Sequence, residues 1–591
     1  MNCKRLADLI ARLAQDTRAQ LFFVWAALLL SLPPVGVCWL AFVALVPLVR
    51  QILNPERPKW LYTHLWICGT LFWLCEAHFV RYPHPVNYVL WGAMACYLGV
   101  YLPLFVSVSR VWLYRILPSL FPRLSTTTAA LFVLPLTWAA CDILRYWIFT
   151  GYFMSSLCHA FYLWTPFIQT ADLVGEWGTT ATVVFLGVCL ATCVRRQDGR
   201  PRPRWTPILA AALMCAGIFS YGFWRMSQPC EAIPNTTLAL LQGNIPAQLF
   251  VDEAQVRATE EQYFGLVRQA ILQAQAENRP IDLLVFPESI YRHPVIFEEP
   301  NALQPPDLLD ENDQPMSPEE FRHRLHAAAE FTQDNLRTFT RICGLPIITG
   351  CGVEVYSPIG VKSYNTAIYV QPQGAETVET LRDACYHKMH LVPFGEYIPF
   401  MRTLRRWKPD IVRLSPIGPG GEMGDCPVAF EIPTQSGTPV IASMNICFES
   451  AVGRLLRRQL STLRKAGVDP QFLLNVTNNG WFRQSNETKL HLACGVFRTI
   501  ENRKPLLTAA NFGISSVIDS NGRILEQLPT GGTGVLLTSA YRDSLNRRTL
   551  FACTGHLSLW FPLVLFFAGA FVGLRSKSAG TTGNESKSAH G

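Results

Sequence analysis

One cysteine in the sequence stands where a nucleophile is usually placed. The apolar run Ile441–Ile446 predicts a buried strand, Cys447 follows it, and Glu449–Ala466 predicts an amphipathic helix. A thiol at a helix start feels the positive end of the helix dipole, which favours the thiolate that attacks carbonyl carbon. The chain has 18 cysteines, however, and most cysteines are small buried apolar side chains. Cys447 is therefore a nucleophile only if suitable partners accompany it.

Two other motifs offer such partners. Phe286–Ser289 places Glu288 at the end of a short apolar run, where a partly desolvated carboxylate can act as a general base. Tyr386–Glu396 contains Lys388, a fixed cation for a developing oxyanion, and Glu396, which could orient it. Each motif also has an ordinary interpretation, because glutamates often cap helices and loop lysines are usually solvated. Together the three residue types suit nucleophilic attack on a carbonyl group.

The elements around these motifs indicate a layered α/β domain. Ser317 is placed to cap a helix that begins with Pro318, and Glu320 completes a capping box. The strands are expected to pack in sheets covered by helices, and the pattern is also compatible with antiparallel neighbours. We expect strands at 237–245, 281–286, 345–350, 365–370, 428–432, 472–477, 506–510 and 515–519, with helices at 253–277 and from 318 to about 341.

The rest of the chain indicates a membrane protein. Hydrophobic residues make up 50% of the sequence, and charged residues are rare outside the α/β region. We expect about eight spans, of which the first two are shorter than the roughly 20 residues that a bilayer requires. The spans are predicted at 20–32, 35–48, 61–80, 89–108, 129–148, 167–194, 207–223 and 557–574.

These spans predict three domains and an orientation. Residues 1–227 would form a bundle of about seven spans, 228–548 the catalytic domain, and 549–591 a last span with a cytoplasmic tail. Basic residues cluster before the first span and in every second connection, so the positive-inside rule places both termini in the cytoplasm and the catalytic domain on the outer side. The net charge of +8 fits this clustering, and no basic stripe indicates a nucleic-acid surface.

The cysteine and histidine spacing gives no sign of a metal site. No Cys-x-x-Cys pair or Cys/His group has the spacing of a zinc site. We therefore expect neither a metal nor another cofactor.

At family level the three motifs are more specific together than alone. A Glu, then a Lys, then a Cys, each in this local setting and order, resembles the signature of the carbon–nitrogen hydrolase (nitrilase) superfamily, whose fold is an αββα sandwich. With the multi-span part and the last span added, the whole chain is similar to the apolipoprotein N-acyltransferase family of bacterial inner-membrane enzymes. Further matching stretches are Leu144–Gly151, Gln242–Pro246, His390–Glu396 and Asn478–Phe482.

The resemblance implies a role for each motif residue. Glu288 would be the general base, Lys388 the stabiliser of the tetrahedral intermediate and Cys447 the nucleophile. Glu396 and Glu449 match acidic positions that the family uses to support the lysine and the cysteine.

The resemblance also implies an oxyanion hole, a reaction and its partners. The backbone N–H of Phe448 would complete the oxyanion hole. Cys447 would take an acyl chain from a phospholipid as a thioester and pass it to the α-amine of an apolipoprotein's N-terminal diacylglyceryl-cysteine. The enzyme would be a multi-pass protein of the bacterial inner membrane, a monomer with its catalytic domain in the periplasm.

One stretch suggests a lid, and three positions depart from the family pattern. Phe400–Leu414 interleaves apolar and basic residues, which suits a lid at a lipid surface or an ordinary solvated loop. Phe448 stands where a tyrosine is expected. Phe250-Val251 replaces the Lys-Trp of some members, and Asn479-Gly480 replaces an Asp-Ala. The missing tryptophan affects the expected substrate contacts more than the reaction class.

Two other functions fit parts of the pattern. A membrane-tethered amidase or nitrilase would use the same three residues with water as the acceptor. A non-enzymatic transporter or scaffold would use the bundle alone, with the outer domain as a binding module. Release of ammonia from small amides would indicate the amidase, and substrate uptake by a variant without the three residues would indicate the transporter.

Overall fold

The computed structural model describes residues 16–197, 200–248, 252–305, 316–372, 378–393, 395–397, 421–555 and 557–585. The chain divides into two compact units. One consists of Met1–Gln228 and Arg548–Gly591 and is called the helical unit here. The other, Pro229–Arg547, is called the sandwich unit.

The helical unit is built almost entirely from helices. Among its described residues, two short strands pair antiparallel, β1 Val194–Gln197 and β2 Arg200–Pro203. Its longer helices are α2 Thr17–Ser31, α3 Leu40–Leu53, α4 Leu61–Glu76, α5 Asn87–Gly99, α6 Tyr101–Val111, α8 Thr126–Trp147, α10 Ala171–Thr192, α11 Trp205–Met226 and α19 Leu557–Glu585, with the short α7 Leu117–Leu120, α9 Thr165–Ile168 and α18 Leu550–Thr554 between them.

Four helices among the described residues are long and apolar enough to cross a membrane: Asn87–Leu120, Thr126–Trp147, Ala171–Thr192 and Trp205–Met226. Three further apolar helices, Thr17–Ser31, Leu40–Leu53 and Trp560–Arg575, are shorter. The prediction of about eight spans is therefore not confirmed. Two predicted spans also differ in extent: the one at 61–80 ends as an α-helix at Glu76, and the one at 167–194 is interrupted between Ile168 and Ala171.

The sandwich unit contains two large mixed sheets. One has the order β10-β11-β12-β13-β14-β15, and the other has the order β16-β4-β5-β7-β8-β9 with β6 paired to β7. The first comprises β10 Ala429–Ile432, β11 Val440–Ile446, β12 Phe472–Asn478, β13 Leu506–Asn511, β14 Ser516–Ile518 and β15 Ile524–Gln527. The second comprises β16 Gly534–Thr538, β4 Leu238–Gln242, β5 Leu283–Val285, β6 Tyr291–Glu298, β7 Ile347–Ser357, β8 Gly360–Val370 and β9 Cys385–His387. A small ribbon pairs β3 Cys230–Ala232 with β17 Tyr541–Asp543.

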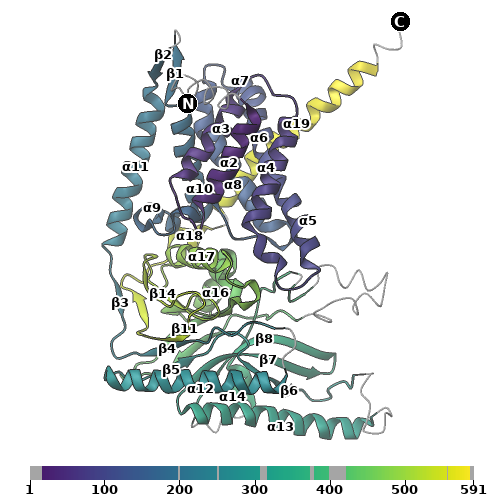
Figure 1. Ribbon diagram of the computed structural model, residues 1–591, viewed down its shortest axis with the longest axis vertical. Helices are drawn as coiled ribbons and strands as arrows, with labels where there is room; N and C mark the ends of the chain where they lie inside the picture. The colour runs from purple at the N-terminus through teal and green to yellow at the C-terminus, as the bar shows by residue number, and fades with distance from the viewer. Residues whose placement is uncertain are drawn as a thin grey trace, which may run out of the picture. The chain divides into compact units, whose positions relative to one another are not determined.

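The two sheets pack face to face, and helices cover their outer faces. One core cluster joins Leu240 and Val285 of one sheet to Met444 and Leu474 of the other. A second cluster places helix residues against the outer face of the seven-stranded sheet. Figure 1 shows α12 Glu253–Ala276, α13 Pro318–Cys343 and α14 Val378–Asp383 on that side, and α16 Gly453–Lys465 and α17 Glu487–Asn502 beyond the other sheet. This is the expected αββα sandwich.

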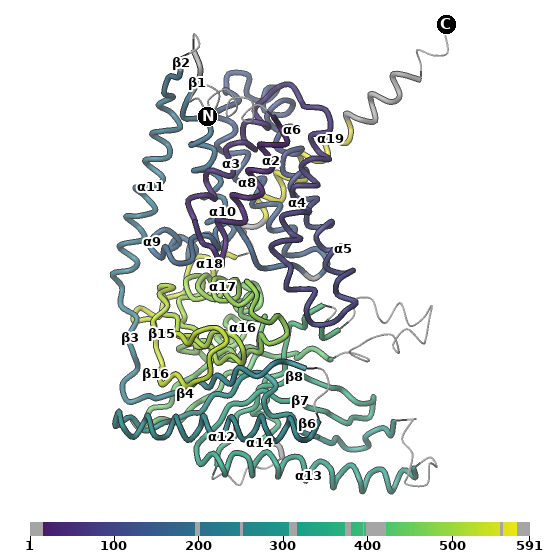
Figure 2. The backbone as a smooth tube through the Cα atoms, in the orientation of Figure 1, coloured from purple at the N-terminus to yellow at the C-terminus, as the bar shows by residue number. Residues whose placement is uncertain are grey.

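Local sequence explains where α13 begins and ends. Ser317 has an extended backbone and its hydroxyl accepts a hydrogen bond from the Glu320 N–H at 3.2 Å, as the capping motif predicts. Gly344 ends the helix with φ +68°, a conformation that glycine adopts without steric cost. The last strand of the seven-stranded sheet, β16, pairs antiparallel with β4, although almost 300 residues separate the two strands. Figure 2 shows β16 and β4 side by side.

The helix predicted at Glu449–Ala466 is wrong in its first turn. Cys447–Ala451 forms a 3₁₀ turn, and the α-helix α16 begins only at Gly453. Cys447 therefore lies at the start of one tight turn and not at the end of a long helix dipole.

Candidate active site

The three proposed catalytic side chains come from the carboxyl ends of strands in both sheets. Lys388 directly follows β9, and Cys447 directly follows β11. Glu288 follows β5, which runs parallel to β4 and β7. Gly350 on β7 packs against the backbone of Glu288 so closely that a Cβ there would lie 2.5 Å from the Glu288 Cα. The fold thus brings Glu288, Lys388 and Cys447 into one site, although 100 positions separate the first two in the sequence and 59 separate the last two.

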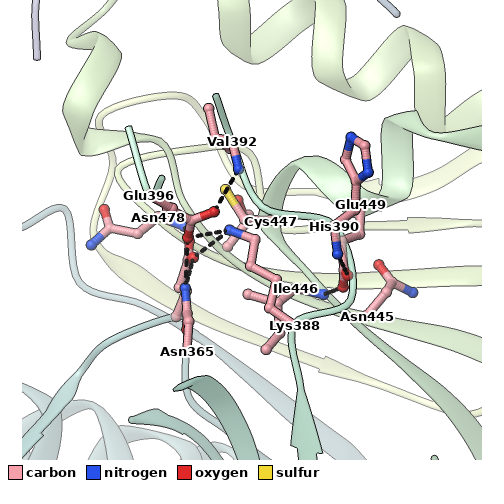
Figure 3. A network of polar contacts seen from close by, with 12 residues as sticks. Asn365, Lys388, His390, Val392, Glu396, Asn445, Ile446, Cys447, Glu449 and Asn478 are labelled. Atoms are coloured by element: carbon pink, nitrogen blue, oxygen red, sulfur yellow. Dashed lines mark hydrogen bonds and ion pairs between the residues drawn. The ribbon is translucent and has the colours of Figure 1, made fainter. Parts of the chain in front are cut away.

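Lys388 forms the centre of the polar contacts. Its side chain is 1% exposed, and its ammonium lies 2.7 Å from Glu396 Oε1 and 3.2 Å from Glu288 Oε1. Burial alone would lower the pKa of Lys388, but the two carboxylates outweigh it and hold this pKa well above its ordinary value. Figure 3 shows the end of the Lys388 side chain directed toward the Glu396 carboxylate and the Cys447 sulfur. The lysine is therefore a fixed positive charge beside the sulfur.

Each carboxylate has further donors. Glu288 is buried and accepts hydrogen bonds from Asn365 Nδ2 at 2.8 Å and from the Asn478 backbone N–H at 2.9 Å. Glu396 accepts from Asn365 Nδ2 at 3.0 Å and from the Val392 N–H at 2.8 Å. Burial would raise the pKa of Glu396, but the Lys388 ammonium and these donors lower it below its ordinary value. Both carboxylates are thus held in fixed positions around the lysine.

The Cys447 thiol is buried and protonated at rest. Burial raises the pKa of Cys447 above its ordinary value, the Glu288 carboxylate raises it further, and Lys388 opposes them. The expected helix-stabilised thiolate is therefore not found, because desolvation and a neighbouring carboxylate replace the helix dipole. Cys447 also has φ +54°, a left-handed conformation that costs a non-glycine residue about 1–3 kcal/mol. The chain bends sharply where β11 ends and the 3₁₀ turn begins, and Cys447 lies at this bend.

Glu449 connects the cysteine turn to the lysine segment. One carboxylate oxygen accepts from the Ile446 N–H and the Tyr386 hydroxyl, both at 2.7 Å. The other accepts from the Met389 N–H at 2.7 Å and the His390 N–H at 2.9 Å (Figure 3). Burial raises the pKa of Glu449 to about 7, against these four donors. Glu449 therefore ties together the two segments that hold Cys447 and Lys388.

Several residues of this network were not predicted as site residues. Asn365 was only the first residue of an expected strand, yet it bridges Glu288 and Glu396. Tyr386 was only the first residue of the Lys388 motif, and Asn478 the first of a matching stretch, and neither had an assigned role. No local signal marks them, because their function depends on contacts between strands of different sheets.

Phe448 is partly buried and packs against the core between the sheets. Its N–H belongs to the peptide that directly follows the sulfur-bearing residue. The predicted lid, Phe400–Leu414, and the Phe250-Val251 departure both lie outside the described residues. No group of three or more histidine, cysteine, aspartate or glutamate side chains in the described ranges could hold a metal ion.

Comparison with family models gives two matches. Residues 237–546 match the carbon–nitrogen hydrolase model. Residues 26–189 match the model of the apolipoprotein N-acyltransferase N-terminal domain. The first match covers the sandwich unit almost completely, and the second covers much of the helical unit.

Individual proteins give the same picture. The chain is 28% identical over 537 residues to an apolipoprotein N-acyltransferase of Rhodopirellula baltica, covering 87% of this chain and 90% of that protein. It is 27% identical over 526 residues to one of Geobacter metallireducens, covering 86% of each. Among solved structures, an amidase from Nesterenkonia sp. matches with 15% identity and a TM-score of 0.33, over 55% of this chain and 98% of that one.

Proposed function

The chain belongs to the carbon–nitrogen hydrolase family, and on this basis we propose that it moves an acyl chain from a phospholipid to the N-terminal amine of a lipoprotein. The observation that supports this most is the buried lysine, held by two carboxylates and adjacent to a buried thiol. The match of residues 26–189 to the N-terminal domain of apolipoprotein N-acyltransferase favours acyl transfer over simple hydrolysis.

The first half of the reaction makes a thioester. Glu288 takes the proton of the Cys447 thiol while the sulfur attacks the ester carbonyl of the phospholipid. Because the raised pKa of Cys447 keeps the thiol protonated at rest, the sulfur becomes a nucleophile only when the base acts. The Lys388 ammonium and the Phe448 N–H stabilise the oxyanion. The tetrahedral intermediate then collapses, and Glu288 returns the proton to the departing lysophospholipid.

The second half uses the same groups with an amine. The α-amine of the diacylglyceryl-cysteine attacks the thioester carbonyl and forms a second tetrahedral intermediate. Glu288 takes a proton from the amine and gives it to the sulfur as the carbon–sulfur bond breaks, which restores both the Cys447 thiol and the Glu288 carboxylate. Glu396 keeps Lys388 in place throughout, and Glu449 keeps the lysine segment against the cysteine turn.

The proposal includes the position of the protein in the cell. The spans of residues 1–227 and 549–591 anchor it in the bacterial inner membrane, with residues 228–548 in the periplasm and both termini in the cytoplasm. The enzyme acts as a monomer on a phospholipid donor and an apolipoprotein acceptor in the same membrane.

Trapping the acyl-enzyme tests the proposal directly. Full-length protein in phospholipid vesicles is expected to gain one acyl chain on Cys447, detected by mass spectrometry and removed by hydroxylamine. Cys447→Ala abolishes the adduct and the transfer to a diacylglyceryl peptide, whereas Cys426→Ala, at an exposed cysteine of the same unit, leaves both unchanged. Full transfer by the Cys447→Ala variant would refute the assignment. Ammonia release from small amides without any acyl transfer would favour the amidase.

A further inference from the structure

Two buried side chains donate to the backbone carbonyl of Cys447, and a third buried side chain supports one of them. Asn475 Nδ2 donates to this carbonyl at 3.0 Å and the Ser450 hydroxyl at 3.2 Å. Behind them, the Nε2 atom of His491 lies 2.6 Å from the Ser450 oxygen. Asn475, Ser450 and His491 are 0%, 2% and 8% exposed. We call these three residues the carbonyl clamp.

The hydrogen-bond partners of His491 determine which ring nitrogen holds the proton. Asn479 Nδ2 lies 3.3 Å from His491 Nδ1, and an amide –NH₂ can only donate, so Nδ1 accepts. The proton therefore lies on Nε2, which is 2.6 Å from the Ser450 oxygen. Burial lowers the pKa of His491 to about 4, so the ring is neutral near pH 7. Donors thus run in one direction, from Asn479 through His491 and Ser450 to the Cys447 carbonyl.

This carbonyl and the Phe448 N–H are two ends of one peptide group. A peptide group is planar and trans, so its C=O and N–H point in opposite directions. Donors that fix the direction of the carbonyl therefore fix the direction of the N–H. These donors matter because Cys447 has φ +54°, a conformation that residues other than glycine rarely adopt unless surrounding contacts hold them there.

We propose that the carbonyl clamp positions the oxyanion hole by holding the Cys447–Phe448 peptide with its N–H directed at the reacting carbonyl oxygen. This inference rests on the proposed function, because it requires a tetrahedral intermediate on Cys447. The clamp residues are positioning residues: Asn475 and Ser450 donate to the peptide carbonyl, His491 orients the Ser450 hydroxyl, and the substrate meets only the N–H. Aligned donors on the carbonyl also polarise the peptide and strengthen its N–H as a donor.

Two reactions of the same thiol separate this role from a general structural one. Acylation by a phospholipid passes through an oxyanion and needs the N–H. Alkylation of Cys447 by iodoacetamide displaces iodide at a saturated carbon, forms no oxyanion and does not need it. Both rates are measured on the full-length protein in vesicles, with the modified Cys447 peptide quantified by mass spectrometry.

The variants remove the donors one at a time. Ser450→Ala and His491→Leu are expected to slow acylation roughly ten- to a hundredfold, approaching the loss seen when an oxyanion donor is deleted elsewhere. Alkylation is expected to change less than twofold in both. His491→Gln is expected to restore most of the acylation rate, because its terminal –NH₂ can replace Nε2–H as the donor. Ser450→Ala removes a single hydroxyl and provides the test if a ring substitution prevents folding.

The outcomes are distinct. Loss of acylation alone, with recovery in His491→Gln, supports the clamp. Parallel loss of both rates overturns it, because that result means the thiol itself is displaced. Unchanged acylation in Ser450→Ala and His491→Leu also overturns it. Cys447→Ala separates the two proposals. If that variant still transfers acyl chains, the proposed function fails. If Cys447→Ala is inactive but Ser450→Ala and His491→Leu are fully active, the clamp fails and the proposed function stands.

Discussion

Glu396 tests the view that a fixed ammonium stabilises the transition state. Its carboxylate accepts from Lys388 at 2.7 Å, from Asn365 at 3.0 Å and, through the other oxygen, from the Val392 N–H at 2.8 Å. In Glu396→Gln the amide oxygen can still serve Lys388 and Asn365. The amide –NH₂ then faces the Val392 N–H, so that donor loses its acceptor. The substitution preserves shape and removes one charge.

The expected magnitudes follow from these contacts. A hydrogen bond to a charged group contributes about 1.5–3 kcal/mol and a neutral one about 0.5–1.5 kcal/mol. The hydrogen bond that holds Lys388 in position is therefore expected to weaken by about 1–1.5 kcal/mol. If this loss falls on the transition state, acylation slows roughly five- to twelvefold. The orphaned Val392 N–H costs a further 1–3 kcal/mol, roughly, in the free energy of unfolding. Because Glu396 is among the groups that raise the pKa of Cys447, its neutralisation lowers that pKa and speeds alkylation.

Acylation and alkylation of Glu396→Gln are therefore expected to change in opposite directions. The assay measures single-turnover acylation from phospholipid vesicles and iodoacetamide alkylation of Cys447 at one pH. Glu422→Gln, at an exposed carboxylate on the same stretch of chain, is the matched control and is expected to change neither rate. An acylation rate equal to that of the unmodified protein, or equal losses in the two reactions, contradicts the reasoning.

Two further predictions concern packing and pH. Gly350→Ala is expected to lower the free energy of unfolding by more than about 2 kcal/mol and to displace Glu288, because its Cβ would lie 2.5 Å from backbone atoms of Glu288 and Ser289. Gly352→Ala places its Cβ in open space, so its free energy of unfolding is expected to change by less than about 0.5 kcal/mol. Equal thermal stabilities of the two variants would contradict this. The folded-state pKa of His491, about 4, lies below its ordinary value of 6.5. As pH falls, the unfolded chain therefore binds a proton at this histidine before the folded protein does. The free energy of unfolding is expected to fall by up to about 3 kcal/mol as pH drops from 6.5 to 4. His491→Gln lacks this part of the pH dependence in thermal unfolding, and an unaltered profile would argue against it.

The sequence predicted the fold because its signals are local. The apolar run before Cys447, the capping box at Ser317 and the strand before Glu288 each depend on neighbours within a few residues. All nine expected strands, the one at Ile441–Ile446 included, overlap observed ones, and the helix expected at 253–277 is observed as Glu253–Ala276. The αββα order followed from the family resemblance more than from periodicity, since mixed sheets give no distinct sequence pattern.

The contacts that make the site work could not be predicted in this way. Asn365 bridges two carboxylates from neighbouring segments, and Tyr386 reaches Glu449 across the gap between the sheets. Such pairings depend on register and sheet packing, which residue spacing does not encode. The state of the thiol was misjudged for a related reason. A helix start suggested a thiolate, but burial beside Glu288 determines the pKa of Cys447.

The division of the site between two sheets has a mechanical consequence. The base and the ammonium belong to one sheet and the sulfur belongs to the other, and hydrogen bonds such as Tyr386–Glu449 and Asn478–Glu288 join the two at this point. A slip of the layers by an ångström would leave every helix and strand intact and still separate the sulfur from its proton acceptor. Catalysis in such an architecture therefore depends on the alignment of the two sheets as well as on the folding of each.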